Sequence, residues 1–342
     1  MEKIISVVAS PNIAFVKYWG KKDNKLKIAT NDSISMTLSA DVVCTKTTIL
    51  LSNKLKKDTF FLNGIKREDD NLRETLEMWR ERIPGFGSEI KILIISENNF
   101  PTASGLASSA SGYAALAVAV GEAFGITDPK EQSMLARMGS GSASRSIFGG
   151  FVGWKAGEKK DGTDSYAYQI APKKHWDDLV DVVGIISKKE KKVSSRAGME
   201  ATTATSQLYS KRMEKMKKTN DAVKKTIMEK DFSTLMREIM QDSNSMHAVM
   251  LDTWPPISYL NDTSKEIIEK IHEYNEKEIK AGYTFDAGPN AHIITTKKNS
   301  AEVKKLLLAV KGVQDVLVVP VGEGPKILAP DNEIVRKFKD KE

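Results

Sequence analysis

Residues 101–112 (PTASGLASSASG) form a stretch of small and hydroxyl-bearing residues that leads into an apolar segment. Small residues at the start of a helix leave backbone N–H groups open to a phosphate, and the helix dipole adds positive potential there. The hydroxyls of Ser108 and Ser109 are suitable ligands for Mg²⁺. No Gly-Lys-Ser/Thr follows, so this is not a Walker A loop. The stretch predicts a phosphate-binding loop or, as the alternative, a small-residue helix contact that only permits close packing.

A second cluster of donors occupies residues 139–146 (GSGSASRS), where four serines surround Arg145. A planar guanidinium grips a carboxylate or a phosphate through two parallel hydrogen bonds. The cluster therefore indicates an anion site. A flexible loop with a surface arginine is the alternative, because loops are commonly rich in glycine and serine.

Lys17 is a lone lysine among apolar and aromatic residues in the segment 11–21 (PNIAFVKYWGK). Removing an unpaired ammonium group from water is costly, so Lys17 needs an anionic partner unless its side chain reaches the surface. We expect that partner to be Asp286, in residues 283–291 (YTFDAGPNA). An acid between a phenylalanine and a Gly-Pro turn suits a general base or an electrostatic role. A turn-forming aspartate that caps the backbone is the alternative.

The four histidines have no metal-ligand spacing among them: His175, His247, His272 and His292. His247 lies on an apolar helical face and is expected to be a core residue. We predict no zinc or other tightly bound transition metal.

The elements that must position these segments differ between the two halves of the chain. In the first half, hydrophobic patterning predicts strands over 3–9, 45–51, 89–95 and 151–154, and a buried helix over 113–124. Asp128 and Pro129 follow in the order of an N-cap and a first-turn proline, which predicts a second helix.

The second half begins with a predicted strand over 180–187 and continues as helical pattern over 198–250. A helix–strand–helix–strand series then follows at 264–280, 291–296, 301–310 and 315–321. Helices against a small sheet indicate a two-layer α/β sandwich. We expect a domain boundary near residue 187.

The composition is that of an ordinary globular protein of 342 residues, with a net charge of +7. Cys44 is the only cysteine, which excludes an intrachain disulfide and fits a reducing cytoplasm. No secretion signal or membrane-spanning run is found, so we expect a soluble cytoplasmic protein. A basic chain binds either nucleic acid or a small polyanion. The densest basic run, residues 188–192 (KKEKK), has no aromatic residue and is typical of a solvated loop.

Seven segments together resemble the mevalonate diphosphate decarboxylase family, which is part of the GHMP kinase superfamily. They are residues 12–21, 31–38 (NDSISMTL), 101–112, 139–150, 193–199 (VSSRAGM), 242–256 (DSNSMHAVMLDTWPP) and 283–291, in the family's order. The resemblance implies an α+β GHMP-kinase fold. A ribosomal protein S5 domain 2-like domain (1–187) would hold ATP and substrate. A ferredoxin-like α/β sandwich domain (188–342) would close the active-site cleft.

The resemblance also implies a reaction. ATP, with Mg²⁺, phosphorylates the 3-hydroxyl of mevalonate 5-diphosphate; that phosphate departs, and loss of carbon dioxide leaves isopentenyl diphosphate. The partners implied are a small phosphorylated substrate and, in a homodimer, a second copy of the chain. Nucleic acid and membrane are not expected as partners.

Residue roles carry over from the family by position. Asp286 would be the catalytic aspartate facing the 3-hydroxyl, Lys17 its paired lysine, and Arg145 the arginine that positions the substrate carboxylate. The expected substrate contacts are Asn12, Tyr18, Lys21, Ser140, Ser142, Ser195, Arg196 and Arg73. The expected ATP contacts are Pro101, Ser104, Gly105, Leu106, Ala107, Ser108 and Ser109, the last two also as Mg²⁺ ligands.

One position departs from the family pattern. Relatives often have a basic residue, after a turn matching Asn63-Gly64, that touches the terminal substrate phosphate. Here either Asn71 or Arg73 takes that place, and Asn71 would remove the basic contact. The alternatives are therefore a decarboxylase of the 5-monophosphate, a mevalonate-type kinase with a stable phosphorylated product, and a non-catalytic ligand or nucleic-acid binder. The presence of Asp286, Lys17 and Arg145 together favours the decarboxylase.

Overall fold

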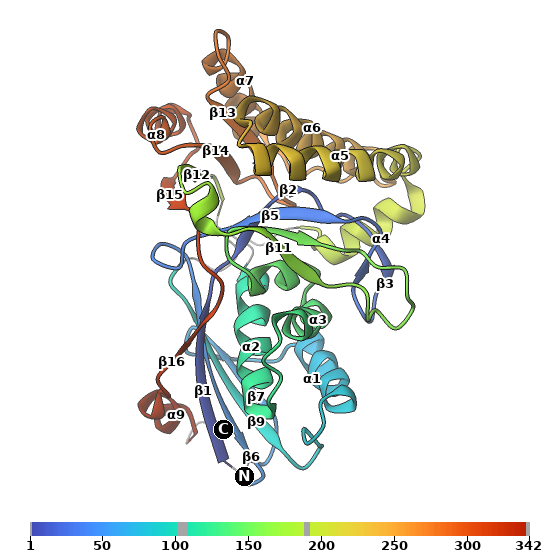
Figure 1. The fold of residues 1–342 in the computed structure, drawn as a ribbon, viewed down its shortest axis with the longest axis vertical. Helices are drawn as coiled ribbons and strands as arrows, with labels where there is room; N and C mark the ends of the chain where they lie inside the picture. The colour runs from blue at the N-terminus through green and yellow to red at the C-terminus, as the bar shows by residue number, and fades with distance from the viewer. Residues whose placement is uncertain (1, 101–107, 188–191, 340–342) are drawn as a thin grey trace.

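The computed structural model describes residues 2–100, 108–187 and 192–339. Figure 1 shows two parts stacked along the long axis of the molecule. The lower part is built on a six-stranded sheet with helices α1 to α3, and the upper part holds helices α5 to α8 over a second sheet. A further four-stranded sheet crosses the middle, between the two parts.

The six-stranded sheet has the order β16-β1-β6-β9-β7-β8, and only the β7–β9 pair is parallel. Side chains along β6 alternate between two cores: Ile49 and Leu51 pack under the helices, whereas Leu50 packs on the opposite face against Phe338 of α9. The strands are β1 (Glu2–Ala9), β6 (Thr45–Ser52), β7 (Thr59–Leu62), β8 (Ile65–Arg67), β9 (Lys91–Asn98) and β16 (Lys326–Leu328). The helices are α1 (Asp70–Arg82), α2 (Ser108–Phe124), α3 (Pro129–Gly139) and α9 (Asn332–Lys339).

The middle sheet is antiparallel, in the order β11-β10-β5-β2. It comprises β2 (Asn12–Val16), β5 (Ser33–Thr37), β10 (Phe151–Trp154) and β11 (Ala167–Ala171), with the small hairpin β3 (Lys21–Asp23) and β4 (Ile28–Ala29) beside it. Two short 3₁₀ helices are also present, η1 (Gly141–Ile147) and η2 (Lys173–His175). Every residue of β2 and β5 is buried, because this sheet has α-helical layers on both sides.

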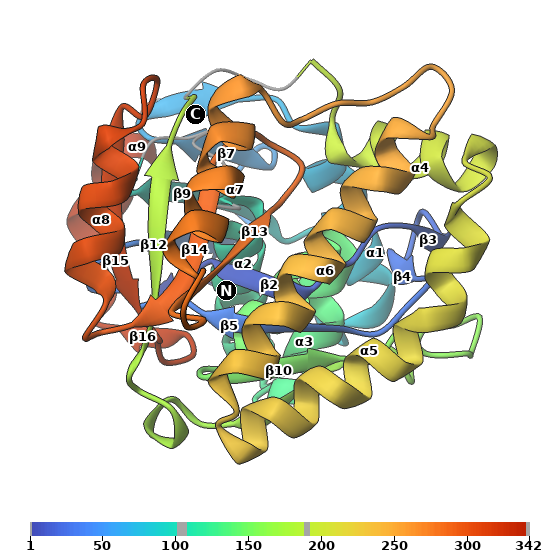
Figure 2. The same ribbon diagram turned by 90° about the horizontal axis from the view of Figure 1, so that it is seen from above.

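The upper sheet is antiparallel, in the order β13-β14-β12-β15, with two helical segments between its strands. This βαββαβ order is that of a ferredoxin-like fold, as the resemblance implied. Its strands are β12 (Leu179–Ile185), β13 (Ala281–Phe285), β14 (Ala291–Thr296) and β15 (Asp315–Pro320). Its helices are α4 (Ser195–Thr205), α5 (Tyr209–Glu229), α6 (Phe232–Leu251), α7 (Asp262–Tyr274) and α8 (Ser300–Ala309). Figure 2 shows α5 and α6 side by side as a helical pair.

Among the differences from the predicted elements, one helix is shorter than expected and one strand was not expected. The helix predicted over 264–280 ends at Tyr274, because the Asn275 side chain donates to the Ala281 carbonyl and accepts from the Lys280 N–H. Near the end of the chain, β16 returns to pair with β1 of the first sheet. The domain boundary near residue 187 stays a prediction.

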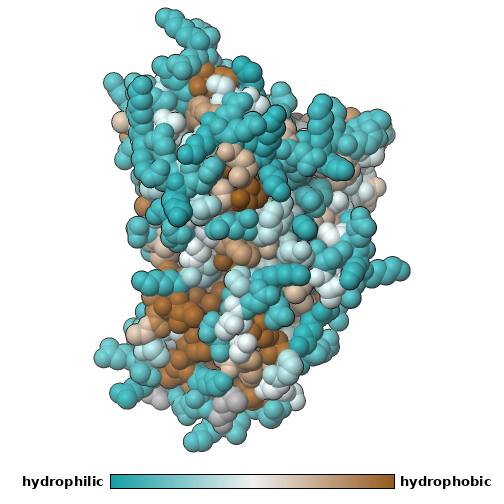
Figure 3. Space-filling view, in the orientation of Figure 1, coloured by the Kyte–Doolittle hydropathy of each residue, from teal (hydrophilic) through white to brown (hydrophobic). Residues whose placement is uncertain are grey.

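The surface differs between the two parts. Apolar residues show mainly on the lower half of the face in Figure 3, whereas hydrophilic residues cover most of the upper half. Within the described ranges, no helix combines the length and the apolar character needed to cross a membrane.

Candidate active site

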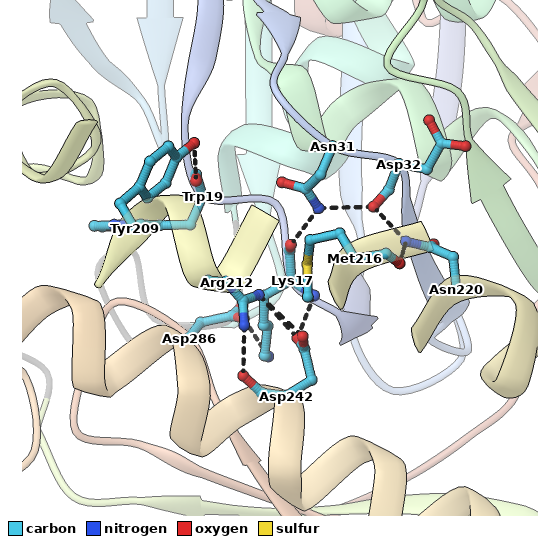
Figure 4. Close-up of polar contacts among 10 residues, drawn as sticks. All are labelled: Lys17, Trp19, Asn31, Asp32, Tyr209, Arg212, Met216, Asn220, Asp242 and Asp286. Carbon is cyan, nitrogen blue, oxygen red and sulfur yellow. Dashed lines mark hydrogen bonds and ion pairs between the residues drawn. The ribbon is translucent and has the colours of Figure 1, made fainter. Parts of the chain in front are cut away.

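The centre of the site is an ion pair between two residues that follow strands of different sheets. Lys17 comes directly after β2 and Asp286 directly after β13, and Lys17 Nζ lies 2.7 Å from Asp286 Oδ1. The lysine side chain is 2% exposed and the aspartate side chain 33% exposed. The expected pairing is therefore present (Figure 4), with the cation buried and the carboxylate partly exposed.

The turn that carries Asp286 is fixed by hydrogen bonds on each side. Before it, the Phe285 N–H donates to Ser243 Oγ of α6 at 3.0 Å. After it, the Ser264 hydroxyl donates to the Pro289 carbonyl at 2.8 Å. The carboxylate therefore projects from a rigid support, as a preorganised catalytic group requires.

Arg145, on η1, is buried beside this ion pair. Its Nε donates to Asn12 Oδ1 at 3.2 Å and its Nη1 to Ser33 Oγ at 2.6 Å. Burial lowers the pKa of Arg145 to about 10, an effect that the negative charge of Asp286 partly offsets. The guanidinium is thus charged at neutral pH and is held in one orientation. It is also close enough to Asp286 for the two opposite charges to attract each other.

Tyr18 lies against the same group with a buried polar atom. Its ring packs edge-on to Trp154 at 4.8 Å between centroids, and a Cβ added to Gly141 would meet the Tyr18 ring at 2.8 Å. Among the described residues the Tyr18 hydroxyl has no hydrogen-bond partner. Burial raises the pKa of this hydroxyl, so it is a neutral donor. A buried hydroxyl without a partner is rare in proteins and indicates a place for a ligand.

A line of hydroxyl groups joins the start of α2 to the Arg145 segment. Ser109 Oγ lies 3.4 Å from Ser140 Oγ, which lies 3.3 Å from Ser142 Oγ. Asn12 Nδ2 donates to the Ser142 carbonyl at 3.0 Å. The first turn of α2 contains no acidic residue, so its N-terminal end can accept an anion. Pro101, Ser104, Gly105, Leu106 and Ala107 lie outside the described residues.

Three cations, Lys21, Lys27 and Arg196, lie close enough to influence one another electrostatically. Burial, together with the positive charges of Arg196 and Lys27, lowers the pKa of Lys21 to about 8. Burial and Arg196 also lower the pKa of Lys27, which is 4% exposed and has a left-handed backbone with φ of 56°. Cations held this close favour an anionic ligand between them. Nothing in the sequence around Lys27 indicated its place in the site.

The structure distinguishes Asn71 from Arg73. Asn71 Nδ2 donates to the Tyr113 hydroxyl at 2.6 Å and to the Gly139 carbonyl at 2.9 Å, and its Oδ1 accepts from Arg196. Arg73 pairs with Asp70 at 2.9 Å and its side chain is 69% exposed. Because α1 turns by about 100° per residue, positions 71 and 73 face roughly opposite sides. Asn71 is therefore the one that contacts Arg196, whereas Arg73 lies on the exposed face of α1.

Arg196 and Ser195 enter the site from the start of α4. Ser194 caps this helix, with its Oγ accepting from the Ala197 N–H at 3.2 Å. Ser195 and Arg196 are thus the first two helical residues, at the end of the helix where the dipole favours a bound anion.

Comparisons with known proteins agree with this geometry over most of the chain. Residues 9–167 match the profile of the diphosphomevalonate decarboxylase-like N-terminal domain. Residues 181–319 match that of the mevalonate 5-diphosphate decarboxylase C-terminal domain. The chain belongs to the diphosphomevalonate decarboxylase family.

Individual relatives align along nearly their whole length. The diphosphomevalonate decarboxylase of Candida albicans is 44% identical, over 94% of this chain and 97% of that protein. The crystal structure of mevalonate diphosphate decarboxylase from Staphylococcus aureus has a TM-score of 0.89 at 36% identity, covering 96% of this chain and 99% of the other. A structure of MDDEF in complex with MVAPP, AMPPCP and magnesium has a TM-score of 0.88 at 34% identity, covering 96% and 99%.

A polar hollow of about 530 Å³ opens beside the start of α2 in this decarboxylase-family chain. It is lined by Cys44, Lys46, Asn63, Glu97, Asn98 and Asn99. Thr45 Oγ1 donates to Asn98 Oδ1 at 2.7 Å and lies 2.6 Å from Ser111 Oγ of α2. The sequence did not reveal this hollow, because its residues come from separate stretches that meet only in the sheet.

His247 is a core residue, as the sequence predicted. It is 7% exposed, and its ring packs edge-on to Phe285. Burial, together with the positive charge of Lys17, lowers the pKa of His247 to about 4. The imidazole is therefore neutral beside the Lys17–Asp286 pair at physiological pH.

Replacing Arg145 with lysine is expected to lower kcat/KM for the family's substrate by at least about tenfold. A point ammonium cannot keep the bonds to Asn12 and Ser33 while also presenting a planar edge to a carboxylate. Steady-state kinetics of Arg145→Lys would measure this effect, with Lys155→Arg as a control outside the site. Equal kcat/KM for Arg145→Lys and the unaltered enzyme would exclude the planar role.

Proposed function

We propose that this chain catalyses the ATP-dependent decarboxylation of mevalonate 5-diphosphate to isopentenyl diphosphate. The 3-hydroxyl is phosphorylated by ATP, the 3-phosphate departs, and the C–C bond to the carboxylate breaks with release of carbon dioxide. The observation that carries the proposal is the partly exposed Asp286 carboxylate, paired with buried Lys17 and adjacent to buried Arg145, in a chain that matches the family over both domains.

At the reacting end, Asp286 faces the 3-hydroxyl, either as a general base or as a stabilising charge. Lys17 keeps the carboxylate anionic and in place. Arg145 holds the substrate carboxylate so that the breaking C–C bond aligns with the carbon that loses phosphate. Two bonds already fix the orientation of its guanidinium, which supports this positioning role.

At the other end, the cation cluster holds the diphosphate. Lys21, Lys27 and Arg196 supply positive charge, and the buried Tyr18 hydroxyl supplies a neutral donor. Ser195 adds a hydroxyl at the first turn of α4. The hydroxyls of Ser140 and Ser142 lie between this cluster and the start of α2, so they suit contacts along the substrate.

ATP fits the start of α2, with its base toward the polar hollow beside Asn98. The donor set there, two hydroxyls and a helix N-terminus with no acidic residue in its first turn, suits phosphate oxygens. Across the described part of the chain, no group of three or more His, Cys, Asp or Glu side chains could hold a metal. Mg²⁺ would be held by Ser108 and Ser109 together with phosphate oxygens and water, and would neutralise phosphate charge.

A coupled assay tests the proposal. The purified chain is mixed with Mg-ATP and mevalonate 5-diphosphate, and ADP and carbon dioxide are followed together. The decarboxylase produces them in equal amounts. A kinase produces ADP and a stable phosphorylated product without carbon dioxide, and a non-catalytic binder produces neither, so either result would refute the proposal.

The pH dependence of kcat/KM provides an independent prediction. Lys21 is charged below its pKa of about 8 and neutral above it, so the free enzyme loses a phosphate partner as the pH rises. Because kcat/KM reports ionisations of the free enzyme, it should fall through about pH 8. Lys21→Arg keeps its charge there and should remove this step. The same alkaline step in Lys21→Arg would assign it to another group.

We also propose that the enzyme is a cytoplasmic homodimer, which the family resemblance supports. Sedimentation velocity would give twice the chain mass of 37.8 kDa for a dimer. A single species at the mass of one chain would contradict it.

A further inference from the structure

The peptide group of Lys17 is held on both sides by residues from other elements. Its N–H donates to Asp242 Oδ2 on α6 at 2.7 Å, and its carbonyl accepts from Asn31 Nδ2 at 3.0 Å. Figure 4 shows these contacts converging on the backbone of Lys17, while its side chain reaches Asp286. One residue thus contacts two carboxylates, Asp242 through its backbone and Asp286 through its ammonium group.

Asp242 is itself paired with Arg212 of α5. Arg212 Nη2 lies 3.0 Å from Asp242 Oδ1, and both side chains are 1% exposed. Arg212 Nη1 also donates to the Asp242 carbonyl at 3.2 Å. The guanidinium therefore compensates the charge of Asp242 and holds its backbone, so that Oδ2 is presented to the Lys17 N–H.

Four buried or half-buried charges lie together here, two cations and two carboxylates. A buried carboxylate without a partner attracts the nearest cation strongly, because little water screens it. With Arg212 absent, the remaining cation of this group of four charges is the ammonium group of Lys17, whose peptide N–H already donates to Asp242. Lys17 would then be drawn away from Asp286.

We propose that the buried Arg212–Asp242 pair is a positioning unit for Lys17. Asp242 fixes the backbone of Lys17, and Arg212 neutralises Asp242 so that the Lys17 ammonium group stays paired with Asp286. This inference rests on the proposed function, because it assigns a purpose to the Lys17–Asp286 pair. Neither Arg212 nor Asp242 contacts substrate. Their effect on the reaction passes through Lys17.

The test uses the full-length chain and separates position from stability. Arg212→Met leaves Asp242 free to compete for Lys17, and should lower kcat about 30-fold while each KM stays within about threefold. Adding Asp242→Asn removes the competing charge but keeps an oxygen for the Lys17 N–H. This double variant should return kcat to within about threefold of the unaltered enzyme. Lys211→Met, which removes the neighbouring exposed cation, is the matched control and should keep full activity.

If Arg212→Met does not fold, the kcat values of two double variants that lack both buried charges can be compared instead. Arg212→Met with Asp242→Asn retains the acceptor for the Lys17 N–H, and Arg212→Met with Asp242→Ala lacks it. The asparagine form should have a kcat about tenfold higher. Equal kcat in these two forms, or a folded Arg212→Met with kcat within about threefold of the unaltered enzyme, would overturn the inference. A lower melting temperature with unchanged kcat would show a structural pair only. An unaltered enzyme that releases no carbon dioxide would instead refute the proposed function.

Discussion

Replacing Asp286 with asparagine is expected to lower the rate of carbon dioxide release by several orders of magnitude, at least about 10²-fold. The amide has nearly the same shape as the carboxylate but neither accepts a proton nor carries charge. It also leaves the Lys17 ammonium, 2% exposed, against a neutral partner. Because the turn around residue 286 is held by Ser243 and Ser264, the fold should persist.

The Asp286→Asn experiment needs separate measurements of turnover, nucleotide affinity and melting temperature. Nucleotide affinity should be largely unchanged, because the start of α2 is built from other residues. Asp262→Asn is a suitable control, since that side chain is 99% exposed and pairs with neighbouring Lys265 on the surface. A folded Asp286→Asn protein with near-normal turnover would remove Asp286 from the mechanism.

Elements with a clear local signal were predicted well from the sequence. The strands β1, β6 and β9 show apolar patterning, and α3 begins where Asp128 and Pro129 predicted it, with the Asp128 side chain accepting from the Lys130 N–H. These signals are local, because a side-chain cap or a two-residue period needs no knowledge of distant residues.

Two buried strands of the middle sheet, β2 and β5, were not identified, and one helix was predicted too long. The strand β2 is buried at every position, so its sequence does not alternate. The segment 275–280 (NEKEIK) is compatible with a helix, and only the Asn275 contacts with the start of β13 end the helix before it. Tertiary contacts outweigh helix propensity here.

The site shows the same division between local and distant information. The local sequence indicated that Lys17 needs an anionic partner and offered Asp286, beside a Gly-Pro turn, as the candidate. The two paired residues are 269 positions apart, so their contact depends on the fold and not on local sequence. The choice between Asn71 and Arg73 was open in the sequence, because it depends on which face of α1 meets Tyr113. Lys27 reaches the cation cluster through a left-handed turn with no distinctive sequence.

The second large effect concerns the substrate: kcat/KM should favour the 5-diphosphate over the 5-monophosphate by at least about 10²-fold. The terminal phosphate would be held by charge-assisted hydrogen bonds from the cluster of Lys21, Lys27 and Arg196. Each such bond contributes roughly 1.5–3 kcal/mol, so losing two costs at least about 3 kcal/mol, or about 10² in specificity. The measurement is kcat/KM for each substrate with Mg-ATP, from carbon dioxide release.

Because residue 71 is neutral, the preference for the diphosphate depends on the other cations of the site. Asn71 cannot bind a phosphate as a cation does, yet its Oδ1 accepts from Arg196, and so it directs that guanidinium toward the cluster. Arg196→Gln should then reduce the preference for the diphosphate by at least about tenfold while changing the monophosphate reaction little. Arg73→Gln, on the exposed face of the same helix as Asn71, should leave the preference unchanged. Equal or faster turnover of the monophosphate would assign the chain to the 5-monophosphate. It would leave the decarboxylation chemistry in place, because Asp286, Lys17 and Arg145 act at the other end of the substrate.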